Sequence, residues 1–286
     1  MGLAGGHGAR RQGAGVAHGR NAREASPGIH ARGQAVIKTY AHLTQDEAPS
    51  SRAVAILPLA AIEAHGPHLP LGTDAIIADG ILDRASQRDT SKREALRLPT
   101  IWLGASDEHG DRAGTLSRQP EAVMSDICSV GVGLAARGVN RVILFNAHGG
   151  NIALATMAAL KLRTRHNMLA ANVHWLDFGL PATLSPPAPA KGDVHGGWME
   201  TSILLHLAPE LVKAPPPSVP GRAPAPSLFP HGPIQWGWLT SDLAPAGYIG
   251  RPDVATADFG RTLVDHAADR LNALIEELSD AAWPRP

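Results

Sequence analysis

The stretch Glu63-Ala-His-Gly-Pro-His-Leu-Pro-Leu-Gly-Thr-Asp74 directly follows an apolar run, Ala53-Val-Ala-Ile-Leu-Pro-Leu-Ala60. The apolar run predicts a buried strand, whereas the glycines and prolines of the stretch after it forbid a regular helix or strand. A polar loop held at the end of a core strand is a common position for functional side chains. We therefore expect the functional site to be built on this loop.

The loop contains carboxylates and imidazoles at close spacing. Glu63 and His65 are two residues apart, so their side chains point to the same side of an extended segment. Carboxylate and imidazole together are typical ligands of zinc, manganese or iron. Alternatively, Asp74 caps a helix that begins near Ala75, and His68 is a hydrogen-bonded loop histidine. Taken together, Glu63, His65 and Asp74 favour a metal site.

Strands, loops and helices alternate along the chain. Apolar spacing predicts helices over residues 75–87, 119–137, 152–166 and 255–278, and strands over 96–103, 141–145 and 168–175. This alternation predicts parallel βαβ units in an α/β fold, a three-layer α/β/α sandwich with a mostly parallel sheet. Ligands bind at the carboxyl ends of the strands in such folds, so we expect the polar loops on one rim of the sheet.

Composition limits the classes of function. Lysine plus arginine and aspartate plus glutamate both number 26, so nothing indicates a nucleic-acid or membrane-surface partner. The single cysteine, Cys128, excludes an internal disulfide and a cysteine-rich zinc site. Without a membrane-spanning run or a signal-peptide core, we expect a cytoplasmic protein with a small-molecule substrate. Residues 1–34 contain few large apolar side chains, so we expect a disordered extension there. Residues 35–286 are expected to form a single domain.

Two further polar segments contain candidate residues. His148 follows the predicted strand 141–145 and precedes a glycine pair that lets the backbone approach a ligand closely. Asn151 either belongs to the site or caps the next helix. His195 is a candidate acid/base group or a histidine bonded to backbone. Glu200 is a candidate metal ligand, or an acidic residue in the first turn of a helix, where the dipole favours an anion.

These segments resemble the signature blocks of the creatininase (creatinine amidohydrolase) family. The similar blocks are Glu63-x-His-Gly-Pro-His-Leu-Pro-x-x-x-Asp74, Asn146-x-His-Gly-Gly-Asn151, His195-Gly-Gly-x-x-Glu-Thr-Ser202, Ser106-x-Glu-His109 with Gly114-Thr115, and Gly247-Tyr-Ile-Gly250 with Ala255-Thr-Ala257. The resemblance runs from about residue 36 to 280. It implies the three-layer α/β/α fold over residues 35–286, a hydrolase with two divalent metal ions (Zn, Mn or Fe), and a homohexamer.

The resemblance also implies roles for individual residues. The family's metal ligands fall on Glu63, His65, Asp74 and His148, with Asp74 bridging the two ions. Creatininase has a glutamate two residues after the metal-binding histidine, where this chain has Gly150, and Glu200 is the expected substitute.

The same resemblance implies two catalytic residues: His195 matches the catalytic histidine, and Trp175 resembles an active-site tryptophan. Independently of the resemblance, Glu108 is a second acid/base candidate. Lys191 stands where the family has another tryptophan, which counts against creatinine as the substrate.

The expected reaction is metal-dependent hydrolysis of a carbon–nitrogen bond. A hydroxide bridging two ions attacks an amide-type carbonyl, and His195 transfers the proton to the leaving nitrogen. The substrate is a cyclic amide such as creatinine, a formamide on a pyrimidine nucleotide precursor, or a modified peptide. The nucleotide would need cations such as Arg112, Lys191 or Arg251 near the rim, and the peptide would need an open groove. A metal-binding protein without turnover is the alternative from another class.

Overall fold

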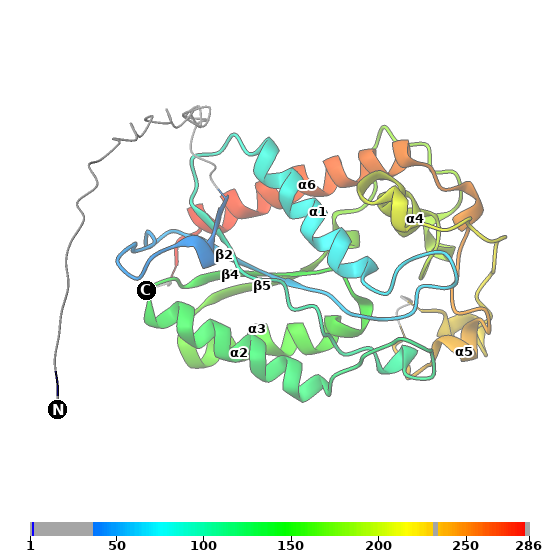
Figure 1. Cartoon of the computed structure of the whole chain (residues 1–286), viewed down its shortest axis with the longest axis horizontal. Coiled ribbons are helices and arrows are strands. Elements are labelled where there is room, and N and C mark those ends of the chain that lie inside the picture. The colour runs from blue at the N-terminus through cyan, green and yellow to red at the C-terminus, as the bar shows by residue number, and fades with distance from the viewer. Residues whose placement is uncertain (1, 3–36, 231–233, 284–286) are drawn as a thin grey trace. The chain divides into compact units, whose positions relative to one another are not determined.

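The computed structural model describes residue 2 and residues 37–230 and 234–283, and residues 35–286 form one compact unit (Figure 1). Apart from Gly2, the segment 1–34 lies outside the described residues, so its predicted disorder stays a prediction. None of the described helices is both long enough and apolar enough to cross a membrane.

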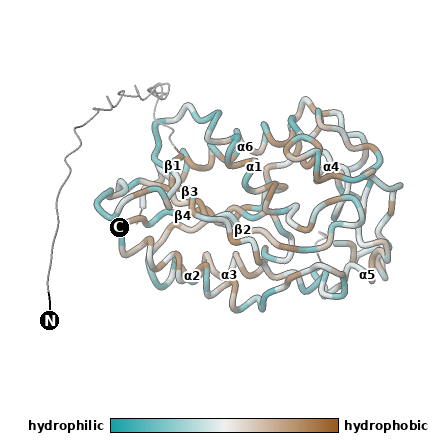
Figure 2. Tube along the Cα trace, viewed as in Figure 1, coloured by the Kyte–Doolittle hydropathy of each residue, from teal (hydrophilic) through white to brown (hydrophobic). Residues whose placement is uncertain are grey.

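Five parallel strands form one sheet in the order β1-β3-β2-β4-β5. Their bounds are Ile37–Thr39 for β1, Val54–Leu59 for β2, Ala95–Arg97 for β3, Arg141–Asn146 for β4 and Leu169–His174 for β5. The central strands β2 and β4 are buried along their whole length. They are nearly continuous apolar runs, visible as the pale to brown core in Figure 2, as expected for parallel strands covered on both faces.

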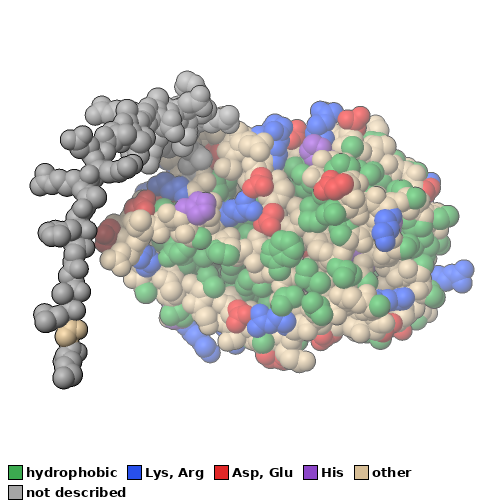
Figure 3. All heavy atoms as spheres, in the orientation of Figure 1, with side chains coloured by type: hydrophobic (Ala, Val, Ile, Leu, Met, Phe, Trp, Pro, Cys, Tyr) green, Lys and Arg blue, Asp and Glu red, His purple; other side chains and the backbone are tan. Residues whose placement is uncertain are grey.

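Helices cover both faces of the sheet (Figure 1). One layer contains α1 (Thr73–Arg88), α4 (Trp198–Leu207) and α6 (Ala257–Asp280), and the other contains α2 (Pro120–Ala136) and α3 (Ile152–His166). Successive side chains of each strand point to opposite faces of the sheet. Ile56 and Phe145 pack against the layer of α1, α4 and α6, whereas Leu57 and Leu144 pack against the layer of α2 and α3. The predicted three-layer α/β/α fold is confirmed. Acidic and basic side chains are interspersed on the face in Figure 3, consistent with zero net charge.

The helices predicted over 75–87, 119–137, 152–166 and 255–278 are confirmed within a few residues. The strand predicted over 96–103 is wrong beyond Arg97, where β3 ends. Pro99 has no backbone N–H and interrupts the ladder. Beyond Arg97 the chain keeps isolated contacts with the β2 segment: Leu98 N–H donates to Ile56 O, Ile101 N–H to Pro58 O and Ala60 N–H to Ile101 O, each at 2.9 Å.

The register of the sheet places three loops together. Leu59, Asn146 and His174 are aligned across β2, β4 and β5, so the segments after these strands leave the sheet at the same rim. After β2 the chain enters α1 in one layer, and after β4 it enters α3 in the other. The crevice between β2 and β4 is therefore the topological switch point, where ligands bind in open α/β sheets.

Candidate metal centre

The loop after β2 brings three predicted ligands together. Nε2 of His65 lies 3.1 Å from Asp74 Oδ1, and Nδ1 of His65 lies 3.1 Å from the carbonyl oxygen of Glu63. Asp74 is the second residue of α1, whose N-cap is Gly72, so the alternative that Asp74 is the cap is wrong. Gly66 makes the turn possible: its φ is +69°, and an added Cβ would lie 2.8 Å from the Tyr248 ring.

The loop after β4 orients His148. Its Nε2 lies 2.8 Å from the carbonyl oxygen of Ala105, which only accepts hydrogen bonds, so Nε2 carries the proton. Its Nδ1 then faces Glu63 Oε2 at 3.2 Å and Asp74 Oδ2 at 3.3 Å. A histidine whose other nitrogen donates to a carbonyl is oriented as a metal ligand.

Asn151 holds this loop to its neighbours instead of capping α3. Its Oδ1 accepts from the N–H of Ala105 (3.1 Å), and its Nδ2 donates to the carbonyl of Ala60 (3.1 Å). The side chain makes no cap hydrogen bond to α3. Asn151 therefore fixes the spacing between the loops that follow β2, β3 and β4.

The third segment, 193–200, adds His195 and Glu200. Nε2 of His195 lies 2.8 Å from the carbonyl oxygen of Ala64, and its Nδ1 lies 3.8 Å from Glu63 Oε1. Oε1 of Glu200 lies 3.9 Å from His65 Nε2, while its Oε2 accepts from the N–H of Gly196 at 2.6 Å. Glu200 thus lies both in the first turn of α4 and at the site, and its role as a metal ligand stays a prediction.

His109 is a further member of the cluster that was not predicted as a ligand. Its Nε2 lies 3.6 Å from Glu63 Oε1, and its ring centroid lies 4.1 Å from that of His195. The hydroxyl of Thr240 donates to the carbonyl of Glu108 (3.0 Å) and lies 2.9 Å from His109 Nδ1. The motif Ser106-x-Glu-His109 contains the only sequence signal for this position. Thr240 comes from α5 (Thr240–Leu243), which the sequence analysis did not predict.

Opposite charges shift the pKa values at the centre of the cluster. Burial alone would raise the pKa of Glu63, yet the imidazoles of His148 and His109 hold it well below its usual range. Burial alone would lower the pKa of His148, yet Glu63 and Asp74 raise it well above its usual range. For His65, Asp74 outweighs the effect of burial and raises the pKa to about 10.

The groups around this centre respond mainly to burial. Burial, reinforced by His109 and His65, lowers the pKa of His195 well below its usual range. Burial raises the pKa of Glu200 to about 7, with His65 opposing it. Burial also raises the pKa of Glu108, with His148 opposing it. His195 is therefore a neutral imidazole near neutral pH.

The donor set fits a divalent cation. Glu63 Oε2 and Asp74 Oδ2 are buried and accept no hydrogen bond from any residue that the structure describes. Buried carboxylate oxygens without partners are costly unless a cation neutralises them. Among the described residues, ligand atoms lie within 4.8 Å of one another in four groups: Glu63, His65 and Asp74; His65, His195 and Glu200; Glu63, Glu108 and His148; and Glu63, His109 and His195. The first three groups together hold every predicted ligand. Mixed oxygen and nitrogen ligands suit zinc, manganese or iron.

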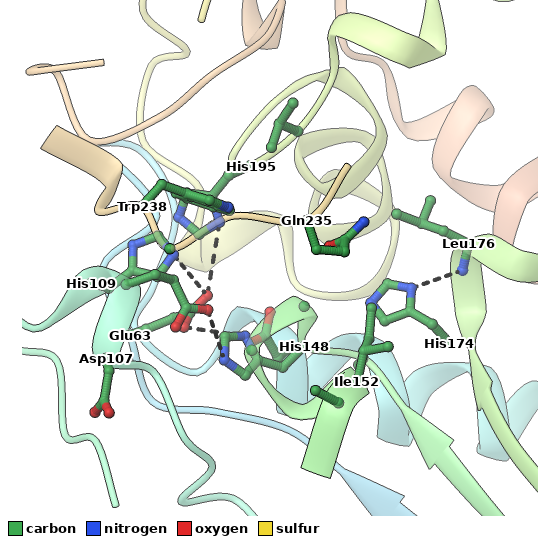
Figure 4. Close-up of a pocket in the computed structure, with 18 of the residues that line it drawn as sticks. Glu63, Asp107, His109, His148, Ile152, His174, Leu176, His195, Gln235 and Trp238 are labelled. Atoms are coloured by element: carbon green, nitrogen blue, oxygen red, sulfur yellow. Dashed lines mark hydrogen bonds and ion pairs between the residues drawn. The ribbon is translucent and has the colours of Figure 1, made fainter. Parts of the chain in front are cut away.

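The cluster lines a cavity of about 410 Å³. Figure 4 shows Glu63 between His109, His148 and His195, with Ile152, His174 and Leu176 farther across the cavity. Apolar side chains form the remaining wall: Ile152, Leu176, Val194, Trp236 and Trp238. The two tryptophans, which the sequence analysis missed, pack against Leu243 and Ile249 and belong to a segment without regular structure.

Trp175 does not line this cavity, contrary to its expected role as an active-site tryptophan. It is 3% exposed and belongs to the hydrophobic core on the α1 side of the sheet. Its neighbours His174 and Leu176 line the cavity, and the N–H of Leu176 donates to His174 Nδ1 at 3.2 Å. Because β5 ends at His174, the intervening Trp175 turns into the core.

Comparison with known proteins gives the family. The sequence profile described as creatininase, creatinine amidohydrolase, matches residues 41–275. A mycofactocin precursor peptide peptidase of Mycobacterium tuberculosis is 33% identical over 234 residues, covering 80% of this chain and 86% of the relative. A creatinine amidohydrolase of Pseudomonas putida is 26% identical, covering 62% of this chain and 78% of the relative.

A solved structure described as a manganese creatininase shares the fold, with a TM-score of 0.67 at 22% identity, covering 80% of this chain and 92% of that chain. With the profile matching most of the chain, this protein belongs to the creatininase family and is a hydrolase of carbon–nitrogen bonds in a metal-dependent family.

Proposed function

We propose that this protein is a metal-dependent peptidase that cleaves a modified or precursor peptide. The observation that carries the proposal is the mixed lining of the cavity, in which the carboxylates and imidazoles of the cluster lie together with Trp236, Trp238 and Leu176. Its volume of about 410 Å³ falls within the range of roughly 300–1,000 Å³ that accommodates drug-sized ligands. A compact cyclic amide such as creatinine would leave the aromatic wall largely unused, whereas a peptide side chain would contact it.

The charge of the cavity also favours a peptide over a nucleotide. Among the wall residues that the structure describes there is no lysine or arginine to bind a phosphate. Arg112 instead donates to the carbonyls of Pro245 (2.8 Å) and Ala244 (3.3 Å), and Arg251 pairs with Asp253 at 2.8 Å. The relatives named as mycofactocin precursor peptide peptidases support the same substrate class.

The proposed metal ligands are Glu63, His65, Asp74, His148 and Glu200, with Asp74 placed between the two histidines. Its Oδ1 faces His65 and its Oδ2 faces His148, which suits a carboxylate shared by two ions. When bound, divalent ions supply Lewis-acid activation of water and of the substrate carbonyl. A homo-oligomeric assembly, a hexamer by family resemblance, and a cytoplasmic location stay predictions.

His195 is the proposed proton carrier. The carbonyl of Ala64 holds the proton on Nε2, which leaves the Nδ1 lone pair directed at the centre of the cluster. Because the imidazole is neutral, Nδ1 accepts a proton as water attacks the peptide carbonyl, and donates it to the leaving nitrogen as the C–N bond breaks. His109, held by Thr240, packs against His195 and fixes the ring position.

The test compares substrates under identical metal loading. The chain is purified without chelator, loaded with manganese or zinc, and incubated with creatinine and with a panel of peptides that includes a mycofactocin precursor peptide. Mass spectrometry should detect peptide cleavage that is lost with chelator or in the Asp74→Asn variant. The peptidase proposal is wrong if creatinine is hydrolysed with a higher kcat/KM than every peptide of the panel.

A further inference from the structure

We infer that Glu108 is a metal ligand that completes, with Glu63 and His148, one half of the metal centre. This inference rests on the proposed metal site and changes the role of Glu108 from an acid/base group to a ligand. The centre then has two halves: one contains His148 and Glu108, and the other contains His65 and Glu200.

The placement of Glu108 supports this role. Glu63, Glu108 and His148 each offer a ligand atom within 4.8 Å of the others. The 3.4 Å contact of Glu108 Oε1 is with the protonated Nε2 of His148, so it places the carboxylate beside the ring without itself being a metal contact. Glu63 Oε2, in a residue only 1% exposed, accepts no hydrogen bond from the part of the chain that the structure describes. Two carboxylates this close repel each other unless a cation lies between them or one of them holds a proton. Nδ1 of His148 and Oε2 of Glu63, which lie 3.2 Å apart, supply the other donors once a metal ion displaces the proton between them.

Gly150 provides the space that Glu108 occupies. A Cβ added at Gly150 would lie 2.5 Å from Glu108 Oε1 and 2.5 Å from His148 Nε2, and would also clash with the carbonyl oxygen of Ala105. Both distances are too short for real contacts. The Ala105 carbonyl oxygen alone excludes a side chain at position 150, and the missing side chain leaves the space next to His148 that the Glu108 carboxylate occupies.

The backbone around Glu108 is fixed in this position. Glu108 lies in a 3₁₀ turn, Asp107–His109, and its carbonyl accepts a hydrogen bond from Thr240. The preceding residue, Asp107, has its carboxylate directed away from Glu63 (Figure 4) and accepts from the Ser117 hydroxyl at 2.6 Å. Two adjacent acidic residues are thus directed differently, and only Glu108 reaches the cluster.

Glu200 belongs to the opposite half. Its Oε1 lies 3.9 Å from His65 Nε2, and its other oxygen is held by the N–H of Gly196. The family resemblance predicts Glu200 as the substitute for the glutamate absent at position 150. The geometry assigns that substitution to Glu108, because Glu108 shares the space next to Gly150 and His148.

The experiment measures metal content and metal affinity, without substrate, in wild type and in Glu108→Gln, Glu200→Gln and Asp107→Asn. We expect about two divalent ions per chain in wild type. Glu108→Gln and Glu200→Gln should each lose one ion, because an amide is a poor ligand. Affinity at the lost site should fall by more than the roughly 10–100-fold that removal of an outer-sphere partner costs. Asp107→Asn removes the same charge one residue away and should keep both ions.

The Glu108→Gln substitution also separates a ligand from a positioning residue. If Glu108 only oriented His148 by accepting its Nε2 proton, the amide oxygen of the introduced glutamine would still accept it, and the variant would keep both ions at wild-type affinity. That result, with circular dichroism confirming the fold, would overturn the inference. Equal losses in Glu108→Gln and Asp107→Asn would also overturn it, because a general charge effect would then suffice.

The inference and the proposed function fail in distinguishable ways. If wild type holds only one ion, the two-metal arrangement is wrong, and loss or retention of that ion in Glu108→Gln still decides the role of Glu108. If metal content follows the expected pattern but no peptide is cleaved, the substrate proposal fails while the ligand assignment stands.

Discussion

The polar and aromatic walls of the cavity are built in different ways. The polar wall lies on loops that leave β2 and β4 directly, and every predicted ligand on them is buried. The aromatic wall, residues 235–238, has no regular secondary structure and is attached to the polar wall through Thr240. The polar wall is therefore held by a strand-end scaffold, whereas the aromatic wall lies on a segment without regular structure, and we propose that the first carries the chemistry and the second contacts the substrate.

The polar wall should respond most strongly to substitution. Replacing His195 with Ala removes the Nδ1 that accepts the proton, and turnover should fall by roughly 10²–10⁴-fold, the usual contribution of a positioned acid/base group. Metal content should stay at the wild-type value. Single-turnover kinetics measure the rate, and metal analysis of the same sample measures the metal content. Unchanged turnover would remove His195 from the mechanism, and lost metal would make it a ligand instead.

Substitution of Thr240, which links the two walls, should have an effect of intermediate size, on the stability of the protein. Thr240→Val keeps the shape of the side chain but leaves His109 Nδ1 and the carbonyl of Glu108 without their hydroxyl partner. An unpaired buried polar group costs about 1–3 kcal/mol, so the free energy of unfolding should fall by about that amount. Urea denaturation measures the free energy of unfolding, and Thr240→Ser is the control because it keeps the hydroxyl. Equal stability of the Val and Ser variants would show that the hydroxyl does not hold the two walls together.

The aromatic wall should give the smallest and most selective effect. Trp238→Ala removes an apolar contact for the substrate, and we expect kcat/KM for a cleaved peptide to fall about tenfold, the equivalent of about 1.4 kcal/mol. Metal content should not change, because Trp238 has no ligand atom. Trp238→Phe, which keeps an aromatic surface, should recover most of the loss. An equal loss for all peptides, regardless of side chain, would argue against a role in selection.

The sequence predicted the features that depend on local pattern. The apolar run 53–60 and the polar loop after it predicted β2 and its ligands, because a strand buried on both faces is continuously apolar and because glycine and proline prevent regular structure in the next segment. The helices between strands predicted the parallel sheet, and with it a common rim for Glu63 and His148. The spacing of His195 and Glu200 indicated a third contribution without showing which histidine Glu200 would approach.

Only the tertiary structure decided the features that depend on distant contacts. His109 enters the cluster through Thr240, which lies 131 residues away in the chain. Trp175 turns into the core because β5 ends one residue earlier, whereas Trp236 and Trp238 reach the cavity from a segment without a periodic signal. The pairing of Glu108 with Gly150 depends on the packing of two loops. Spacing along the chain specifies which side of an element a residue faces, but neighbours across loops are set by packing, which no local pattern records.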